Sequence, residues 1–495
     1  MRSVLTTERT LVAGPALRTG PRASYRGVAQ GPGEPHVVRT ELAGSSTKDA
    51  ARDGQGIGCF VHLTDLHVTD VQSPARFEFV NREWGDPRFR ELLTMQRPHE
   101  TLNTHAIEAM VRAINRVETG PLTGAAPSLV AVTGDGIDNT QHNELANLIA
   151  LLDGGEVRPD SGAPGYDGVQ RVDWRGEIYW KPDGPEDGDQ FQSELGFPRH
   201  PGLLERAMLP FASEGLRLPW LRCWGNHEQV CQGVGVVTPE LARWMVGSRK
   251  PIAMPPGIDP EAAVETFVQG AERFATGAYL EVAPDADRRP IGRADLLPES
   301  TCYVRDEGLV RFITLDTVCN AGGADGAVPR EQLHWLERRL EEAHSTFRSR
   351  DGSPVRSAEE DRYVVVLSHH GYDTLSNPRC DQHADDLLAL LSRFQNVILW
   401  LNGHVHANRI TPRSTFWEVT TSALVDWPCQ SRLVEVYRTA GGDLAIGCTM
   451  LDHDGEGLAG LHRELAANVP GNGFDSWRPG EAADRNAILL LPAPF

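Results

Sequence analysis

The sequence predicts an α/β protein whose buried strands deliver polar loops to one edge of a sheet. Short apolar runs with the length and bulk of buried strands recur along the chain, and helix-like segments lie between them. Five of these runs end directly in a loop that carries aspartate, asparagine or histidine. Because open α/β sheets bind their ligands beyond the carboxyl ends of the strands, these loops predict a functional site.

The size and charge of the chain limit the classes of function. With 495 residues, it exceeds the usual single domain, so we expect two domains or one domain with long insertions. The 48 Lys and Arg residues against 68 Asp and Glu residues give a net charge of −20. This charge disfavours nucleic acid and anionic membranes as partners, whereas local cations can still attract a small anion.

The cellular location of the protein is predicted from the lack of a secretory signal, the lack of a membrane-spanning run and the pattern of cysteines. Residues 1–50 lack the apolar segment of a secretory signal, and no apolar run reaches membrane-spanning length. We therefore expect a cytoplasmic protein with no membrane partner. The eight cysteines include no CxxC pair, so we expect reduced thiols that pack in the interior.

The first predicted strand, residues 59–64, follows an N-terminal arm, residues 1–57, that shows no sustained period. This strand ends at Asp65 and His67. An amphipathic helix is predicted from Asn103, because apolar residues then recur at the three-and-four spacing of one buried face. Taken alone, Asp65 and His67 also fit ordinary turn chemistry, since aspartate is common after strands.

The second predicted strand, residues 129–133, leads into a loop with three candidate side chains. These are Asp135, Asp138 and Asn139. Glycine stands on both sides of Asp135, which allows a turn to bring its carboxylate close to a ligand.

Two long irregular stretches flank the third predicted strand, residues 220–224. Residues 153–218 are rich in Gly, Pro and Asp and carry Trp174, Tyr179 and Trp180, which favours an ordered lid or wall. Residues 247–300 form the second stretch. The strand between them opens onto Asn226 and His227.

Four histidines follow the last two ligand-bearing strands. They are His369 and His370 after residues 363–367, and His404 and His406 after residues 397–401. Two imidazoles one residue apart in a tight turn can point at neighbouring positions, which suits two adjacent metal ions. Each pair alone also fits loop polarity, but all the sets fall at the same end of their strands, which favours one joint site.

Read in order, these motifs resemble the calcineurin-like metallophosphoesterase superfamily. They are DxH at 65–67, GDxxDN at 134–139, GNHE at 225–228, a late histidine and GHxH at 403–406, within residues 59–408. The resemblance implies a four-layer α/β/β/α sandwich of two mixed sheets. We expect a catalytic domain at 58–450, with insertions near 153–218 and 247–300, and a C-terminal extension at 451–495.

The resemblance also implies a two-metal centre. Asp65, His67 and His406 would hold one ion, Asn226, His369 and His404 the other, and Asp135 would bridge both. His370 stays an alternative to His369, because Gly371 stands where many family members have proline. Fe, Mn, Zn, Ni and Co, as divalent or trivalent ions, all suit such a ligand set.

The resemblance gives the remaining loop residues supporting roles. His227 would contact the phosphate or protonate the leaving oxygen. Asp138 and Asn139 would orient Asp135 or His67.

The predicted function is therefore hydrolysis of small phosphomonoesters or phosphodiesters by a hydroxide that two metal ions share. A nuclease of the same superfamily is an alternative, disfavoured by the negative charge and the lack of a basic stripe. A non-catalytic scaffold that binds proteins is another, but such a scaffold would be expected to lose ligands. The sequence carries no signal for an oligomeric state.

Overall fold

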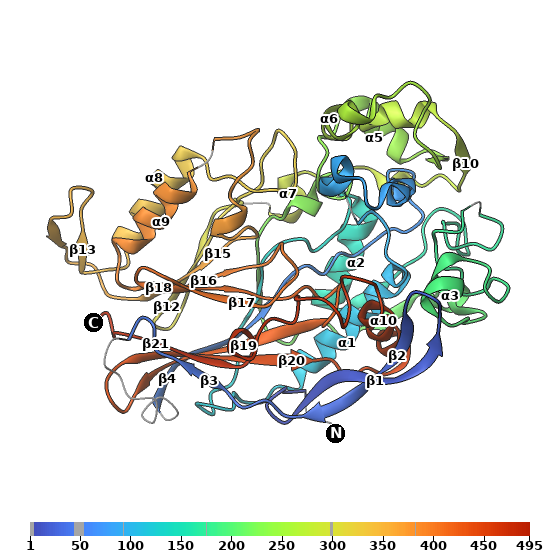
Figure 1. Ribbon diagram of the computed structural model, residues 1–495. Helices are drawn as coiled ribbons and strands as arrows, with labels where there is room; N and C mark the ends of the chain where they lie inside the picture. The colour runs from blue at the N-terminus through green and yellow to red at the C-terminus, as the bar shows by residue number, and fades with distance from the viewer. Residues whose placement is uncertain (1–3, 44–53, 93, 175, 298–299, 382) are drawn as a thin grey trace.

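A computed structural model describes residues 4–43, 54–92, 94–174, 176–297, 300–381 and 383–495 (Figure 1). Parts of the predicted arm, residues 1–3 and 44–53, lie outside the described residues, as do residues 175 and 298–299 of the predicted insertions. Two large mixed sheets and several helices make up an α/β fold, as expected. None of the helices in the described ranges is long and apolar enough to cross a membrane.

The larger sheet has seven strands in the order β3-β21-β20-β19-β4-β5-β8. Its strands are β3 (Val37–Arg39), β4 (Gly54–Leu63), β5 (Val130–Val132), β8 (Trp220–Arg222), β19 (Gln430–Thr439), β20 (Leu444–Asp452) and β21 (Ala487–Leu491). The neighbours β4, β5 and β8 are parallel, with Val61 opposite Val130 and Val130 opposite Trp220. The three predicted strands that precede Asp65, Asp135 and Asn226 therefore end at one edge.

The smaller sheet has six strands in the order β11-β12-β15-β16-β18-β17. Its strands are β11 (Val304–Glu307), β12 (Val310–Thr314), β15 (Tyr363–Leu367), β16 (Val397–Asn402), β17 (Arg409–Arg413) and β18 (Phe416–Thr420). The strands β12, β15, β16 and β18 run parallel. The loops that follow β15 and β16 carry the four candidate histidines and leave the sheet at the same edge.

The two sheets face each other across a buried apolar cluster. Phe60 and Val434 of the larger sheet belong to it together with Val365 and Leu399 of the smaller one. Alternate residues of these strands point to the opposite faces, because side chains in a strand alternate between the two sides of a sheet.

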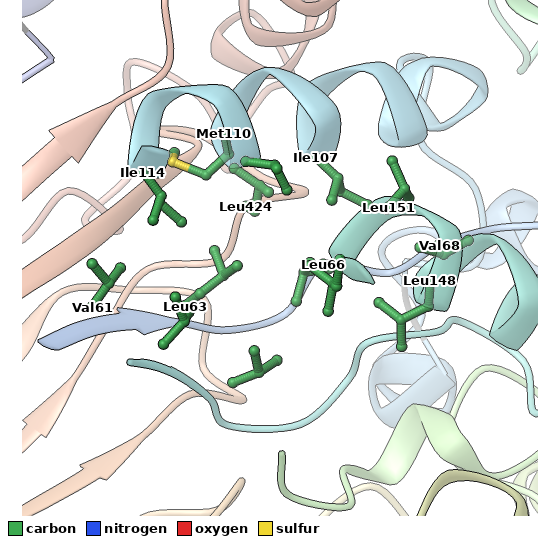
Figure 2. Packing of buried hydrophobic residues seen from close by; sticks show 14 of the residues in the cluster. Val61, Leu63, Leu66, Val68, Ile107, Met110, Ile114, Leu148, Leu151 and Leu424 are labelled. Atoms are coloured by element: carbon green, nitrogen blue, oxygen red, sulfur yellow. The ribbon is translucent and has the colours of Figure 1, made fainter. Parts of the chain in front are cut away.

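Helices cover the outer faces. The helices α1 (Asn103–Asn115) and α2 (His142–Asp153) pack on β4 and β5, and Figure 2 shows Ile107, Met110 and Leu151 above Val61 and Leu63. The helices α8 (Arg330–Glu341) and α9 (Ala384–Ser392) pack on the smaller sheet (Figure 1). The predicted helix from Asn103 is thus confirmed.

The first irregular stretch is ordered around its aromatic residues. It contains β6 (Gly155–Val157), α3 (Gln190–Leu195), α4 (Leu203–Ala207) and β7 (Phe211–Ser213). Trp174, Tyr179 and Trp180 are all buried. Trp174 and Tyr179 pack beside Ile252 and Leu280 of the second irregular stretch, whereas Trp180 belongs to a separate cluster with Tyr25 and Leu465. The aromatic side chains therefore attach this segment to its neighbours.

The second irregular stretch contains several short elements. They are β9 (Arg249–Pro251), α6 (Pro260–Gly270), the 3-10 helix η6 (Ala271–Thr276), β10 (Tyr279–Glu281) and α7 (Arg293–Leu296). Phe267 and Phe274 stack with their ring centroids 3.9 Å apart. The helix α5 (Pro239–Met245) lies beside α6 (Figure 1).

The two ends of the chain lie against the larger sheet. The hairpin of β1 (Arg9–Thr19) and β2 (Ser24–Pro32) contacts α10 (Gly457–Ala467), where the Tyr25 hydroxyl donates to Glu464 Oε1 at 2.9 Å. At the other end of the chain, β21 pairs with β3 and β20 inside the sheet. The strand β4 begins at Gly54, within the predicted arm, because pairing with β19 extends it over residues of low strand propensity.

One expectation about side chains is wrong. Cys319 and Cys380 form a disulfide, whereas reduced thiols were expected; a separation of 61 residues carries no pairing signal in the sequence.

Candidate metal centre

Five loops bring the predicted metal ligands together at the edge where the strands end. The structure gathers the seven side chains of Asp65, His67, Asp135, Asn226, His369, His404 and His406. They come from both sheets, since three loops follow β4, β5 and β8 and two follow β15 and β16. We call these seven side chains the metal-facing cluster.

One part of the cluster comprises Asp65, His67 and His406. His406 Nε2 lies 3.2 Å from Asp65 Oδ1 and 3.3 Å from His67 Nε2. All three side chains are buried. Their ligand-type atoms are close enough to contact one common ion.

The other part is centred on the side-chain oxygen of Asn226. His369 Nε2 lies 3.0 Å from Asn226 Oδ1, and His404 Nδ1 lies 3.1 Å from the same atom. The side-chain oxygen of Asn226 therefore has one imidazole nitrogen of His369 and one of His404 beside it.

Asp135 lies between the two parts. Its Oδ2 is 3.1 Å from His369 Nε2 and 3.7 Å from His67 Nε2. Its Oδ1 accepts a hydrogen bond from the backbone N–H of His227 at 2.8 Å. One carboxylate thus faces a histidine of each part, which is the placement a bridging ligand needs.

The backbone of the cluster adopts an uncommon conformation. The φ angles are 53° at Asp65, 50° at His67, 49° at Asp135, 69° at His404 and 55° at His406. Left-handed φ at residues other than glycine costs on the order of 1–3 kcal/mol each and concentrates at functional sites. The surrounding packing must therefore hold these side chains in place against local preference.

Two glycines of the motifs are required by close approach. A Cβ atom at Gly403 would lie 2.3 Å from Asp65 Oδ2, and one at Gly225 would lie 2.3 Å from Asp135 Oδ1. Any larger residue would push a carboxylate away from the cluster. The glycines of the GNHE and GHxH motifs therefore let the loops approach one another.

The histidines are oriented by acceptors behind them. Nδ1 of His67 lies 2.9 Å from Asp138 Oδ1, Nδ1 of His406 lies 2.7 Å from Asp426 Oδ2, and Nδ1 of His369 lies 2.8 Å from the Thr133 carbonyl oxygen. Because these partners are acceptors, each Nδ1 must carry the proton and donate it. When such a ring is neutral, its Nε2 lone pair then points into the cluster.

This donor set fits metal cations. Nε2 atoms and carboxylate oxygens face one another at 3.1–3.9 Å, which is favourable only with a proton or a metal cation between them. Imidazole nitrogens with carboxylate and amide oxygens are ligands that Zn, Fe, Mn, Co and Ni accept.

The electrostatics of the cluster favour positive charge. Burial disfavours the imidazolium of His67, but Asp138 and Asp65 outweigh it and raise its pKa to about 10. Burial likewise opposes the charged form of His369, while Asp135 raises its pKa to about 9. The pKa of Asp65 lies well below its usual value despite burial, because His406 and His67 stabilise the carboxylate.

His370 lies close enough to His369 and His404 to share an ion with them, but both of its ring nitrogens have partners of their own. Its Nδ1 lies 2.9 Å from Thr317 Oγ1, and its Nε2 lies 2.9 Å from the Ala324 carbonyl oxygen. Both ring nitrogens thus contact the loop after β12, whereas Nε2 of His369 faces Asp135. This geometry favours His369 over His370 as the ligand.

His227 lines a cavity beside the cluster. The volume of this cavity is about 180 Å³. Its Nδ1 lies 3.0 Å from the Asp138 carbonyl oxygen and 3.2 Å from Asp138 Oδ1. The rings of His227 and His67 are 4.3 Å apart. Asp138 therefore contacts both histidines and fixes their relative positions.

Asn139 supports the loops and lies outside the cluster. Its side-chain oxygen accepts from the Gln232 backbone N–H at 3.0 Å, and its amide donates to the Ala75 carbonyl at 3.2 Å. It therefore joins the loops that follow β4, β5 and β8.

Sequence reasoning missed Asp426, Arg97 and Arg478. Asp426 follows the parallel strand β18, so its position at the same sheet edge was a usable signal. The two arginines line the cavity from segments without any motif, and no pattern in the sequence indicates them.

Comparisons with known proteins give distant similarities. No protein-family model and no curated protein matches the sequence. A solved dimetal phosphatase from Danio rerio is 12% identical, with a TM-score of 0.36, and the match covers 81% of this chain and 100% of that one. The sulfate thiohydrolase SoxB from Thermus thermophilus is 15% identical, with a TM-score of 0.29, covering 83% and 59%. GAP50, the anchor in the inner membrane complex of Plasmodium, is 10% identical, with a TM-score of 0.29, covering 83% and 94%.

Proposed function

We propose that this chain is a metal-dependent phosphoesterase of the calcineurin-like superfamily, with a four-layer α/β/β/α arrangement and a dinuclear centre. The observation that carries the proposal is the position of Asp135 between two sets of ligand-type atoms. In this proposal Asp65, His67 and His406 hold one ion and Asn226, His369 and His404 hold the other. The ion identity is one of Fe, Mn, Zn, Ni or Co.

The ions, when bound, would activate water as a nucleophile and neutralise the oxygens of a phosphoryl group. The side chains of the protein align the reacting groups and donate protons. Asp138 accepts from Nδ1 of His67 and of His227, so it aligns a ligand and a cavity-facing histidine together. From the cavity wall, His227 contacts a phosphoryl oxygen or donates a proton to the leaving oxygen.

The proposed substrate is a small phosphate ester, either a monoester or a diester. The cavity volume of about 180 Å³ lies below the usual range for ligands of drug size. A net charge of −20 also disfavours a nucleic-acid polymer. Both observations point to a small substrate instead of a chain.

His404→Ala tests the proposed centre. We expect the purified variant to hold one ion fewer by metal analysis, and to hydrolyse p-nitrophenyl phosphate and its bis-ester at least about a hundredfold more slowly. His334→Ala, at an exposed position on α8, is the matched control and should keep both ions and full turnover. Wild-type turnover by His404→Ala, or wild-type protein that binds no transition metal, would refute the proposal.

A further inference from the structure

Two arginines line the cavity beside the metal-facing cluster, and neither belongs to a ligand motif. Arg97 precedes the 3-10 helix η4 (Glu100–Leu102), and Arg478 precedes α11 (Ala482–Arg485). Both line the same cavity of about 180 Å³ as Asp135 and His406. Two segments far apart in the sequence therefore place permanent cations in one small space.

Both guanidinium groups meet at one carboxylate. Arg97 Nε donates to Asp426 Oδ1 at 3.0 Å, and Arg478 Nη1 donates to Asp426 Oδ2 at 3.1 Å. One negative charge thus faces two positive charges. The other carboxylates near Arg97, which are Glu100 and Asp138, form ion pairs with Arg76. Within the group of Asp426, Arg97 and Arg478, two guanidinium groups therefore face one carboxylate beside the cavity.

The position of Asp426, Arg97 and Arg478 relative to the metal-facing cluster indicates which part of a bound anion the two arginines would contact. His406 faces Asp65 through Nε2 at 3.2 Å and faces Asp426 through Nδ1 at 2.7 Å. These nitrogens lie on different sides of the ring, so the arginines lie about one imidazole ring away from the cluster. A phosphoryl group held at the cluster leaves their charge free for a second anionic group.

We propose that Arg97 and Arg478 select a small phosphomonoester that carries a second anionic group, and this inference rests on the proposed function. A guanidinium group offers several N–H donors in a planar fork that matches a carboxylate or phosphate. The apolar part of the cavity wall, formed by Leu92, Met95 and Val234, offers no side-chain charge that competes for the arginines. The small volume of the cavity suits one small molecule of this kind.

Turnover of two matched esters by the metal-loaded full-length protein tests the inference. The esters are 2-phosphoglycolate and 2-hydroxyethyl phosphate, which differ by a carboxylate against a hydroxymethyl group. In Arg478→Gln we expect KM for 2-phosphoglycolate to rise about tenfold or more, and KM for 2-hydroxyethyl phosphate, which lacks the second anionic group, to stay within about twofold. Arg478→Lys retains the charge and should recover part of the preference, and Arg350→Gln, at an exposed ion pair, should change neither constant.

A structural role of the arginines gives a different result. If Arg478 only positions Asp426, the variant lowers kcat for both esters equally and leaves the ratio of their KM values unchanged. That outcome would overturn the inference. Arg97→Gln serves as the second variant, because Arg97 approaches the same carboxylate from another segment.

Binding of unreactive anions separates the inference from the proposed function. Phosphonoacetate and ethylphosphonate differ by a carboxylate against a methyl group, and titration calorimetry measures both without turnover. We expect the wild-type protein to prefer phosphonoacetate about tenfold and Arg478→Gln to lose that preference. If neither ester is hydrolysed, the proposed function fails while this preference still supports the arginine site. Equal binding of both anions by the wild-type protein overturns the inference.

Discussion

The metal-facing cluster and a second group of buried charges lie close together but are balanced in different ways. The second group, which we call the buried charge network, contains five side chains: Arg76, Glu78, Glu100, Lys250 and Asp138. All five are buried. In this network every charged side chain has an oppositely charged neighbour within the protein, whereas the cluster places carboxylates against imidazole nitrogens that need a proton or a metal ion between them.

The contacts of the network show how this balance is reached. Arg76 pairs with Asp138 and, at 2.8 Å, with Glu100, while Lys250 Nζ lies 2.6 Å from Glu78 Oε1. Lys250 comes from β9 in the second irregular stretch, so that stretch is tied to the loop after β4. The network therefore holds segments together without help from outside.

The metal-facing cluster and the buried charge network use buried charge in two different ways. Burying a charge costs free energy unless a partner is present. The network supplies its own partners: two cations face three carboxylates, and burial raises the pKa of Glu100 to about 7, which lowers the excess of negative charge. The cluster keeps left-handed backbone and places carboxylates against imidazole nitrogens, and in the proposed function bound cations complete its balance. Loss of cations should therefore disturb the cluster and leave the network intact.

Asp135→Asn should give the largest effect, because it removes the carboxylate that both parts of the cluster face. We expect turnover of p-nitrophenyl phosphate to fall at least about a thousandfold. Metal analysis should show weaker binding of both ions. Asp351→Asn, at an exposed turn, is the control and should retain activity and metal. A variant that loses only one ion would show that Asp135 does not bridge.

Arg76→Met should destabilise the fold itself. It leaves Asp138 and Glu100 buried without their cation, which costs about 3–5 kcal/mol of unfolding free energy. Urea unfolding with and without a chelator measures this difference, and we expect the same loss in both conditions. Arg350→Met, which breaks an exposed pair with Glu337, should cost less than about 1 kcal/mol. A loss that appears only with metal bound would assign Arg76 to the cluster instead of the network.

Much of the fold and of the cluster was predictable because the signals are local. The strands before the ligand loops are short apolar runs, and β15 occupies the predicted residues 363–367. The motif glycines are also local signals, since Gly225 and Gly403 stand where carboxylates approach the backbone. A local signal of this kind indicates both the strand and the loop that follows it.

The rest was not predictable because it depends on long-range partners. The position of Asp426 after β18 indicates the sheet edge, but only the fold places this residue behind His406 with two arginines. The disulfide between Cys319 and Cys380 likewise joins loops after different strands. No spacing in the sequence distinguishes these residues from other polar loop residues.

Asp70→Asn should give the smallest effect and adds a pH dependence. Asp70 Oδ2 accepts from Arg288 Nε at 2.9 Å, and this pair joins the second irregular stretch to the loop after β4, as Lys250 does. Burial disfavours the Asp70 carboxylate, but the charge of Arg288 and the hydrogen bonds of Ser161 and Asn143 lower its pKa. Ionised Asp70 therefore stabilises the folded protein.

Because the folded pKa of Asp70 is depressed, its contribution is fully present above the unfolded pKa of about 3.9 and is lost as pH falls through the folded value. We expect Asp70→Asn to lower the free energy of unfolding by about 2 kcal/mol at pH 7. The difference from wild type should shrink below about pH 4, measured in chelator so that metal release does not contribute. A difference that stays constant from pH 7 to pH 3 would mean that Asp70 acts through hydrogen bonds that asparagine also lacks, and that its charge contributes nothing.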